Sequence, residues 1–271
     1  MSSYSVAIVG YGAVGKAIHA LFPHAVSYDA PLGIGSREEV NDCRYAFVAV
    51  PTAGLPDGSA DVSIVEDVVS WIESETIILR STVPVGTTDR LVAESGKQIV
   101  FQPEYGPGHT PDHPFRDLRN VHWAILGGER SATNRVAELY KTIFSADLVI
   151  RQVDARTAEL TKYMENAFLA LKVTFCNEFF DIAQALDVDF EELRELWLLD
   201  PRIGRSHTFV YADDRGFGGR CLPKDLSAII RVAEQAGVEP GVLKKVHESN
   251  QIRRLGASRE GLLEFAAAKP E

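Results

Sequence analysis

The first half of the chain alternates short, almost continuously apolar runs with amphipathic stretches. The runs are rich in Val, Ile, Phe and Tyr, and they occupy residues 6–10, 25–29, 45–50, 76–80, 98–102, 123–128 and 146–151. Runs of this length and composition are typical of buried strands. Helical periodicity recurs between them, as in "SIVEDVVSWIES" (63–74). Apolar strands separated by helices predict a parallel sheet that is covered by helices on both faces.

From about residue 154 the strand pattern stops and only helical periodicity continues. Residues 154–186 have no internal Gly or Pro and predict one long helix, or two in sequence, with Asp154 as N-cap. The second half of this segment is so apolar that it must be buried, within the domain or against another subunit. Residues 189–199 predict a further helix, because Asp189 and Glu192 have the spacing of a capping box.

Two more helices are expected near the end of the sequence. One covers residues 223–237 and ends at Gly237, a typical C′ residue, and the other starts at Pro240, which suits a first helical position. We therefore predict an α/β protein of two domains. Residues 1–153 form a Rossmann-like, doubly wound parallel sheet, and residues 154–271 form an all-helical domain with a long central helix.

Composition narrows the class of protein. The chain has 271 residues, 45% of them hydrophobic, and a net charge of −10 without a basic stripe, so nucleic acid is not an expected partner. It shows neither a secretory signal nor 18 consecutive apolar residues. Cys43, Cys176 and Cys221 are too widely spaced for a disulfide framework or a zinc site. These features predict a cytoplasmic protein with reduced thiols, no metal and no membrane partner.

The first predicted strand runs into "GYGAVG", which has the GxGxxG spacing of dinucleotide-binding turns. Gly10 permits the tight turn, Gly12 lets the backbone approach a pyrophosphate, and Gly15 allows close helix packing. Asp29, at the end of the second strand, suits hydrogen bonds to ribose hydroxyls and repels a 2′-phosphate, so NAD is favoured over NADP. Ala13 and Val14 complete the set of candidate cofactor contacts in this turn. The alternative is a glycine-rich turn in an unrelated α/β protein.

Two polar side chains on the predicted long helix share one face. Lys162 and Asn166 are four residues apart, so they lie one turn from each other. A lysine and an amide in this arrangement suit a substrate hydroxyl or its oxyanion. The alternative, which the spacing itself favours, is a solvated helix face.

The segment "GFGGRCLPKD" (216–225) surrounds a cysteine with glycines and cations. Positive charge favours the thiolate form of Cys221, which makes this residue a candidate nucleophile rather than a small buried hydrophobe. The cations are Arg215, Arg220 and Lys224. Asp225 follows at the start of a predicted helix, where it serves as a base or an N-cap. Cys176 lies in an apolar helix and is expected to belong to the core.

Several segments together resemble one family, and they keep its order along the chain. They are "VAIVGYGAVG", "GSADVSIVED", "RSTVPVGTT", "QPEYG", "ELTKYMENAFLALKVTFCNEF", "DPRIG" and "GFGGRCLPKD". The family is that of the nucleotide-sugar 6-dehydrogenases, typified by UDP-glucose and GDP-mannose dehydrogenases. The combination of "GFGGxCxPKD" with an upstream "KxxxN" is hard to obtain by chance.

The resemblance implies a four-electron oxidation, in which a primary alcohol becomes a carboxylate, two NAD are reduced and the aldehyde stays bound. Cys221 matches the family's nucleophile, which forms a thiohemiacetal and then a thioester, and Asp225 matches its active-site acid. Lys162 and Asn166 match oxyanion and substrate contacts, and Glu104 matches a glutamate linked to thioester hydrolysis and substrate binding. Thr82 matches a threonine near the catalytic water and the cofactor. Arg202 and Gly218 match substrate contacts, and Arg202 is expected to reach the substrate site of a neighbouring subunit. The expected cofactor contacts are completed by Val50, Pro51 and Lys224.

The chain departs from the family pattern in three places. It stops soon after the predicted helices, so it resembles a short form without the family's C-terminal nucleotide-binding domain. The connection over residues 30–44 is shorter than in the family, and Gly108 stands where the family has a second glutamate. We therefore expect the substrate to be either a nucleotide sugar or a smaller phosphorylated alcohol.

Two other functions stay open at this point. The first is a two-electron, β-hydroxyacid-type dehydrogenase, which shares the domain order and the Lys/Asn pair and needs no cysteine. The second is a catalytically silent NAD-binding subunit that a separate nucleotide-binding chain completes. For the assembly, we expect a homodimer joined across the long helix.

Overall fold

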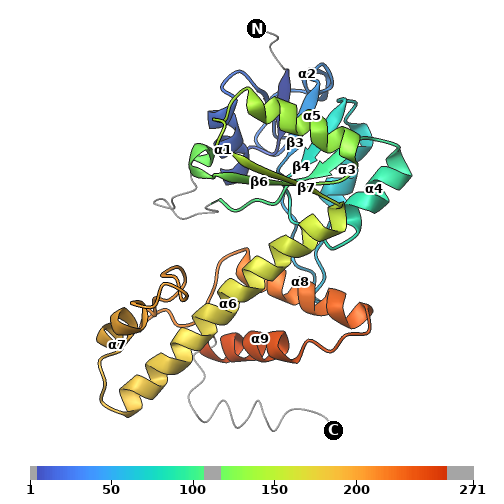
Figure 1. Cartoon of the computed structure of the whole chain (residues 1–271). Coiled ribbons are helices and arrows are strands. Elements are labelled where there is room, and N and C mark those ends of the chain that lie inside the picture. Colours follow the sequence, from blue (N-terminus) through green and yellow to red (C-terminus); the bar gives the residue numbers. More distant parts are fainter. Residues whose placement is uncertain (1–4, 107–116, 255–271) are drawn as a thin grey trace. The chain divides into compact units, whose positions relative to one another are not determined.

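The computed structural model describes residues 5–106 and 117–254, and Gly108 lies outside them. The chain divides into two compact units, Met1–Lys162 and Tyr163–Glu271, and the long helix α6 (Ala155–Ala185) runs across their boundary (Figure 1). Within the described residues, no helix is both long and apolar enough to span a membrane.

The first unit is built on a seven-stranded sheet, and each apolar run predicted as a strand contributes one strand to it. The strands are β1 (Val6–Val9), β2 (Val26–Tyr28), β3 (Tyr45–Val48), β4 (Thr76–Leu79), β5 (Ile99–Phe101), β6 (Trp123–Gly127) and β7 (Val149–Val153). Their order across the sheet is β2-β1-β3-β4-β5-β6-β7. β1 therefore lies between β2 and β3, which makes the β1/β3 boundary the switch point where such sheets bind ligands.

Helices cover both faces of the sheet, as the apolar strands predict (Figure 1). Alternate residues of each strand point to opposite faces: Ala7 and Val9 pack on one core, Val6 and Ile8 on the other. The first core includes α2 (Arg37–Asn41), α3 (Ser63–Trp71) and α4 (Thr87–Ser95), and the second includes α1 (Ala13–Leu21) and α5 (Arg130–Lys141). The prediction of a doubly wound α/β domain is confirmed.

The sheet departs from a wholly parallel arrangement at one pair of strands. β5 and β6 run antiparallel through Phe101 and Gly127, whereas the other neighbouring pairs are parallel. A parallel neighbour needs a long crossover, whereas an antiparallel one does not. The described part of the β5–β6 connection contains only the short helix η2 (Leu118–Asn120). The sheet is therefore mixed, and β6, α5 and β7 form its last parallel unit.

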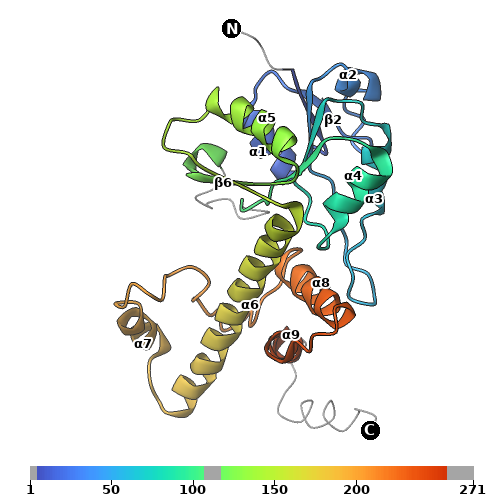
Figure 2. The same cartoon turned by 45° about the vertical axis from the view of Figure 1, so that its right-hand side comes forward.

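The second unit is helical in its described part. Beyond α6 it contains α7 (Phe190–Trp197), α8 (Leu222–Gln235) and α9 (Gly241–Arg254), and α8 packs beside α9 in both views (Figures 1 and 2). Residues 155–185 form one continuous helix, so the alternative of two helices is wrong. Two of the predicted N-caps are present: Asp154 accepts a hydrogen bond from Thr157 N at 2.8 Å, and Asp189 accepts from Glu191 N at 2.8 Å. Helix α9 begins at Gly241, one residue after the predicted start at Pro240.

Helix α6 is buried on one side only. Cys176 and Ala183 form a small core with Phe190 and Val210, so the prediction that Cys176 is a core residue is confirmed. Burial raises the pKa of the Cys176 thiol, which keeps it protonated. Several large apolar side chains of α6 are nevertheless exposed, among them Leu160, Met164, Phe168, Phe175, Phe179 and Ile182.

Close packing fixes the turn from β1 into α1. Gly10 has a φ of +96°, and a Cβ there would lie 2.5 Å from the carbonyl oxygen of Ala49. A Cβ at Gly15 would lie 1.9 Å from the carbonyl oxygen of Gly10, which no real structure tolerates. Gly12 is different, because its Cβ would meet nothing within 4 Å. The outer two glycines are therefore required by the protein itself, and Gly12 is not.

This difference predicts a large loss of stability for one alanine substitution and almost none for the other. Gly15→Ala should lower the free energy of unfolding by about 3 kcal/mol, because the added methyl group must push α1 away from β1. Gly12→Ala should change it by less than about 0.5 kcal/mol. Urea unfolding followed by circular dichroism measures both values. Equal losses in the two variants would show that close packing does not set the glycine requirement.

Candidate active site and cofactor cradle

The cofactor cradle begins with Asp29, whose carboxylate is oriented by two backbone amides. Its Oδ2 accepts from Tyr11 N at 2.8 Å, and its Oδ1 accepts from Leu32 N at 3.1 Å. A carboxylate oxygen has a second acceptor site, so each oxygen can still receive a ribose hydroxyl. The open space above Gly12, at the N-terminus of α1, suits a pyrophosphate. These residues therefore fit a dinucleotide such as NAD.

Side-chain hydrogen bonds join the carboxyl ends of β3 and β4. Ser81 Oγ donates to Val50 O at 2.7 Å, and Thr52 Oγ1 donates to Thr82 O at 2.8 Å. Val50 and Thr82 are half-buried, and Pro51 is exposed. All three lie at the sheet edge that carries Gly10, because the carboxyl ends of parallel strands meet at one edge.

Glu104 follows β5 and is held by a buried arginine from the end of β4. Arg80 Nη2 pairs with Glu104 Oε2, and Gly106 N donates to Oε1. The two charged side chains are only 5% and 11% exposed. Burial disfavours the charged guanidinium, but the neighbouring carboxylate still raises the pKa of Arg80 above its ordinary value. Sequence reasoning missed Arg80; the available signal was an arginine at the end of an apolar strand, directly before "STVP".

Lys162 is buried, with 8% exposure, and its Nζ lies 5.0 Å from the ring centroid of Tyr105. A cation over an aromatic ring is stabilised by the quadrupole of that ring. Asn166, one turn further along α6, is 5% exposed. The interpretation of this pair as a solvated helix face is therefore wrong. Tyr105, which the sequence analysis also missed, directly follows Glu104.

Asp225 is the centre of a buried polar cluster in the second unit. Asn166 Nδ2 donates to Asp225 Oδ2 at 2.5 Å, and Lys224 Nζ lies 2.7 Å from Asp225 Oδ1. Asp225 is 2% exposed, so its carboxylate is screened from solvent and fixed by an amide and a cation. The structure thus brings together three of the predicted site residues. Asp225 is the fourth residue of α8 and not its N-cap.

Cys221 is the N-cap residue of α8 and is exposed, whereas Cys43 and Cys176 are buried. Asp225 N donates to Cys221 O at 2.8 Å, so the first turn of the helix ties the cysteine backbone to the carboxylate-bearing residue. Two of the cations expected around the thiol have other partners. Arg215 is bound by Asp181 at 2.6 Å, and Lys224 by Asp225.

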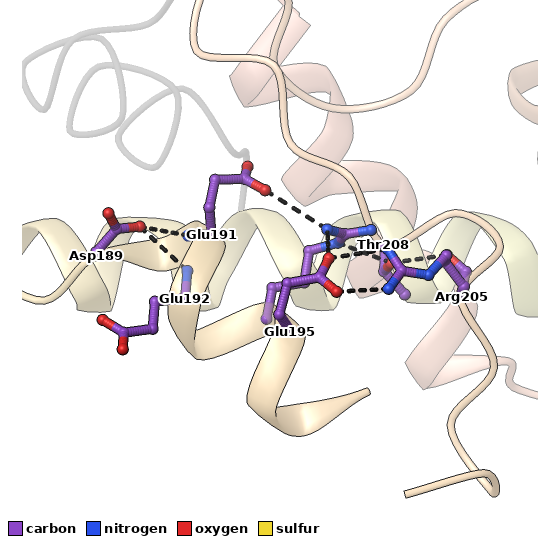
Figure 3. Close-up of polar contacts among 7 residues, drawn as sticks. Asp189, Glu191, Glu192, Glu195, Arg205 and Thr208 are labelled. Atoms are coloured by element: carbon purple, nitrogen blue, oxygen red, sulfur yellow. Dashed lines mark hydrogen bonds and ion pairs between the residues drawn. The ribbon is translucent and has the colours of Figure 1, made fainter. Parts of the chain in front are cut away.

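Arg202 lies between α7 and the glycine loop. Its side chain is 86% exposed and pairs with Asp200 at 2.5 Å. Polar and charged contacts connect α7 with residues 205–208, and several of them are visible in Figure 3. Buried Arg194 donates to Thr208 Oγ1 at 3.0 Å, and Glu195 bridges Arg194 and Arg205. This network fixes the chain on both sides of the Arg202 turn.

A buried carboxylate near the start of α6 has a structural role. Glu159 is fully buried and accepts hydrogen bonds from Gly86 N, Thr88 N and Thr88 Oγ1 at 2.5–2.9 Å. Burial raises the pKa of Glu159, and the three hydrogen bonds oppose that shift. Among the described residues, no group of three or more His, Cys, Asp or Glu side chains is arranged to hold a metal ion.

Comparison with known proteins agrees with this geometry. Residues 32–144 match the NAD-binding domain of the UDP-glucose/GDP-mannose dehydrogenase family, and residues 156–252 match its central domain. The UDP-glucose 6-dehydrogenase of Pseudomonas aeruginosa is 34% identical over 231 residues, which cover 79% of this chain and 49% of that protein. The chain belongs to the UDP-glucose/GDP-mannose dehydrogenase family. It spans about half the length of the curated relatives it matches.

Two solved structures superpose on most of this chain. A UDP-glucose dehydrogenase from the hyperthermophilic archaeon Pyrobaculum islandicum superposes with a TM-score of 0.79 at 29% identity, over 92% of this chain and 68% of that one. The 3-hydroxyisobutyrate dehydrogenase of Mycobacterium tuberculosis gives a TM-score of 0.66 at 17% identity, over 90% of this chain and 91% of that one. The second likeness shows the fold alone.

Membership of the UDP-glucose/GDP-mannose dehydrogenase family confirms the resemblance read from the motifs and the prediction of NAD as cofactor. The matched range begins after the glycine turn. The turn itself is therefore supported by its position at the β1/β3 switch point and by the geometry of Asp29.

The Asp29 geometry predicts how cofactor choice responds to charge. Asp29→Asn should raise the dissociation constant of NAD roughly tenfold, about 1.4 kcal/mol, because the ribose hydroxyls lose a charged acceptor. The same change should improve NADP binding, since it removes the repulsion of a 2′-phosphate. Isothermal titration calorimetry measures both, with the exposed residue Asp42→Asn as control. An unchanged preference for NAD would exclude Asp29 from ribose recognition.

Proposed function

We propose that this chain oxidises the primary alcohol of a nucleotide sugar to a carboxylate, in two NAD-dependent steps that pass through a thioester on Cys221. One observation carries the proposal: the exposed cysteine caps the helix whose first turn holds Asp225, itself buried against Asn166 and Lys224. Nucleophile, acid–base group and oxyanion donor are the parts that such chemistry needs.

The first step removes a proton and a hydride from the alcohol. NAD, bound at the glycine turn and Asp29, supplies the hydride acceptor for both oxidations. Asp225, directly or through a water, accepts the hydroxyl proton. Lys162 and Asn166 stabilise the developing alkoxide, and removing one such donor typically costs roughly 10²–10³ in turnover.

The second step needs the cysteine. The thiolate of Cys221 adds to the aldehyde carbon, and the resulting thiohemiacetal loses a second hydride to become a thioester. Water then attacks the thioester, which releases the carboxylate and regenerates the thiol. We assign the handling of this water to Glu104, held by Arg80, and to Thr82. The net reaction consumes one alcohol, one water and two NAD.

The substrate class rests on the relatives. The curated proteins that match most of this chain are named UDP-glucose 6-dehydrogenases, which makes UDP-glucose the first substrate to test. Arg202, with its exposed side chain, and Gly218, exposed in the glycine loop, are the proposed substrate contacts beyond the reacting centre. A smaller phosphorylated alcohol is the alternative substrate.

The decisive prediction is the stoichiometry and its dependence on the thiol. We expect two NADH for each carboxylate formed from UDP-glucose, measured by absorbance at 340 nm and by mass spectrometry of the product. Cys221→Ala should lower carboxylate formation at least about a thousandfold, because the aldehyde can no longer form a thiohemiacetal. The buried control Cys176→Ala should stay within about threefold of the native rate.

The competing functions give different results in the same experiment. Full turnover in Cys221→Ala, with one NADH for each product, would favour a two-electron reaction of the β-hydroxyacid type. The fold is compatible with that candidate, because the 3-hydroxyisobutyrate dehydrogenase shares it over 91% of its own length. NAD binding without NADH formation from UDP-, GDP- or CDP-sugars or phosphorylated alcohols would favour a catalytically silent subunit.

We also propose that the chain forms a homodimer through α6. The large exposed apolar residues of this helix, from Leu160 to Ile182, recur at spacings of three, four or seven, which puts them within an arc of roughly 100°. A contiguous apolar stripe of this kind is typical of a helix that packs against a partner. A second copy is the occupant that would cover the same stripe on both chains.

The dimer is tested by placing charge on the stripe. Phe168→Glu, with its side chain 57% exposed, should convert a dimer into a monomer, because burying an unpaired carboxylate in the interface is costly. Gln184→Glu adds the same charge on the opposite side of α6 and should leave the dimer intact. Light scattering at micromolar concentration measures the mass. A monomeric native chain would contradict the proposal.

A further inference from the structure

The glycine loop that leads to Cys221 is held by two buried asparagines to which the proposed function gives no role. Asn250, on α9, pairs with both polar backbone groups of Phe217. Phe217 N donates to Asn250 Oδ1 at 2.7 Å, and Asn250 Nδ2 donates to Phe217 O at 2.9 Å. Asn250 is 7% exposed and Phe217 is 4% exposed, so this pair of hydrogen bonds is shielded from water. The side-chain amide of Asn250 thus satisfies both the N–H and the C=O of Phe217, as the backbone of a neighbouring strand would in a sheet.

Asn177, on α6, holds the preceding residues of the loop. Its Oδ1 accepts from Gly216 N at 3.1 Å and from Arg215 Nε at 2.7 Å, and its own carbonyl accepts from Arg215 Nη2 at 2.8 Å. Asn177 is 1% exposed, and its Nδ2 donates to Val173 O, which fixes the orientation of the amide. Three consecutive loop residues, 215 to 217, are therefore bound to two different helices.

This anchoring explains the glycine at the start of the loop. Gly216 has a φ of +78°, and a Cβ there would lie 2.5 Å from Asn250 Oδ1. A Cβ at Gly218 would lie 3.2 Å from Arg254 Nη2, on the same helix. The first of these glycines is thus required by the approach of α9 to the loop, rather than by the presentation of amides to a ligand.

Ion pairs reinforce the same arrangement around the loop. Asp181, on α6, binds Arg215 at 2.6 Å and also pairs with Arg253 of α9. Arg254 of α9 pairs with Asp214, just ahead of the loop. The charges are partly exposed, so each pair is expected to contribute little to stability. They add contacts between α9, α6 and the segment that precedes the loop.

The cysteine lies a short distance along the chain from these anchors. Gly218, Gly219 and Arg220 separate Phe217 from Cys221, and glycine is the residue with the greatest backbone freedom. α8 fixes the far end, where Asp225 N donates to Cys221 O. The side chain of Cys221 can therefore keep one direction only if the near end is fixed as well. A nucleophile must stay within a few tenths of an ångström of its productive position.

We infer that Asn250 and Asn177 are positioning residues, which hold the glycine loop so that Cys221 is aimed for attack on the aldehyde. The consequence for catalysis rests on the proposed function. The anchoring of the loop by Asn250 and Asn177 does not rest on that function, because it consists of hydrogen bonds between the loop and the two helices.

The test uses Asn250→Asp in the full chain, since the aspartate has the same shape but cannot donate to Phe217 O. Hydrogen exchange followed by mass spectrometry should show at least about tenfold faster exchange of the 215–221 amides, equivalent to about 1.4 kcal/mol of lost protection. In single-turnover stopped flow with UDP-glucose, the first NADH should form within about threefold of the native rate. The second should form at least about tenfold more slowly, since only that step needs the thiol.

Gln251→Glu is the matched control, because it makes the same amide-to-acid change at the next, exposed position of α9. It should alter neither the exchange nor either NADH phase. Unchanged loop exchange in Asn250→Asp would overturn the inference, and so would equal slowing of both phases, which indicates general loss of structure. If the native chain does not oxidise UDP-glucose, the proposed function fails for that substrate, while the exchange experiment still decides whether Asn250 holds the loop.

Discussion

The buried polar face of α6 is the constraint on which the rest of the structure depends. A soluble helix usually buries apolar residues and exposes polar ones. Helix α6 buries polar side chains beside its apolar ones: Glu159, Lys162, Asn166 and Asn177 are each at most 8% exposed, whereas the opposite side carries Phe168 at 57%. Polar groups removed from water must find partners, or each costs several kcal/mol. The fold around α6 is largely a set of such partners.

Within each unit, those partners are the functional segments. In the first unit, Glu159 accepts hydrogen bonds from backbone amides at the N-terminus of α4. Lys162 lies over Tyr105, which follows Glu104 of the Arg80–Glu104 pair. In the second, Asn166 binds Asp225, and Asn177 binds the start of the glycine loop. Satisfying the helix therefore also orients the groups to which we assign chemistry. This is an economical arrangement, because stability and preorganisation use the same hydrogen bonds.

Chemistry was easiest to recognise where a motif combines rare residue types at fixed spacing. The glycines of "GYGAVG", followed by Asp29, and the cysteine of "GFGGRCLPKD" identified the cofactor cradle and the candidate nucleophile, because few other structures need those residues there. The role of Lys162 and Asn166 was ambiguous, since their spacing places them on one helix face but does not show whether that face is buried or exposed to solvent. Arg80 and Tyr105 were missed, because an arginine or a tyrosine beside a strand has many ordinary roles.

The sequence by itself determined the seven strands, the N-caps Asp154 and Asp189, the helical nature of residues 155–185 and the family, since these depend on local periodicity and on motifs within a few residues. Only the tertiary structure decided that β5 and β6 run antiparallel, that Lys162 and Asn166 are buried, and that Asn250 reaches across to Phe217. The expectation that three cations surround the thiol depended on proximity in sequence, and the fold gave two of them other partners. Burial and pairing between distant segments are set by the packing of the whole chain, so they leave no signature in a local pattern.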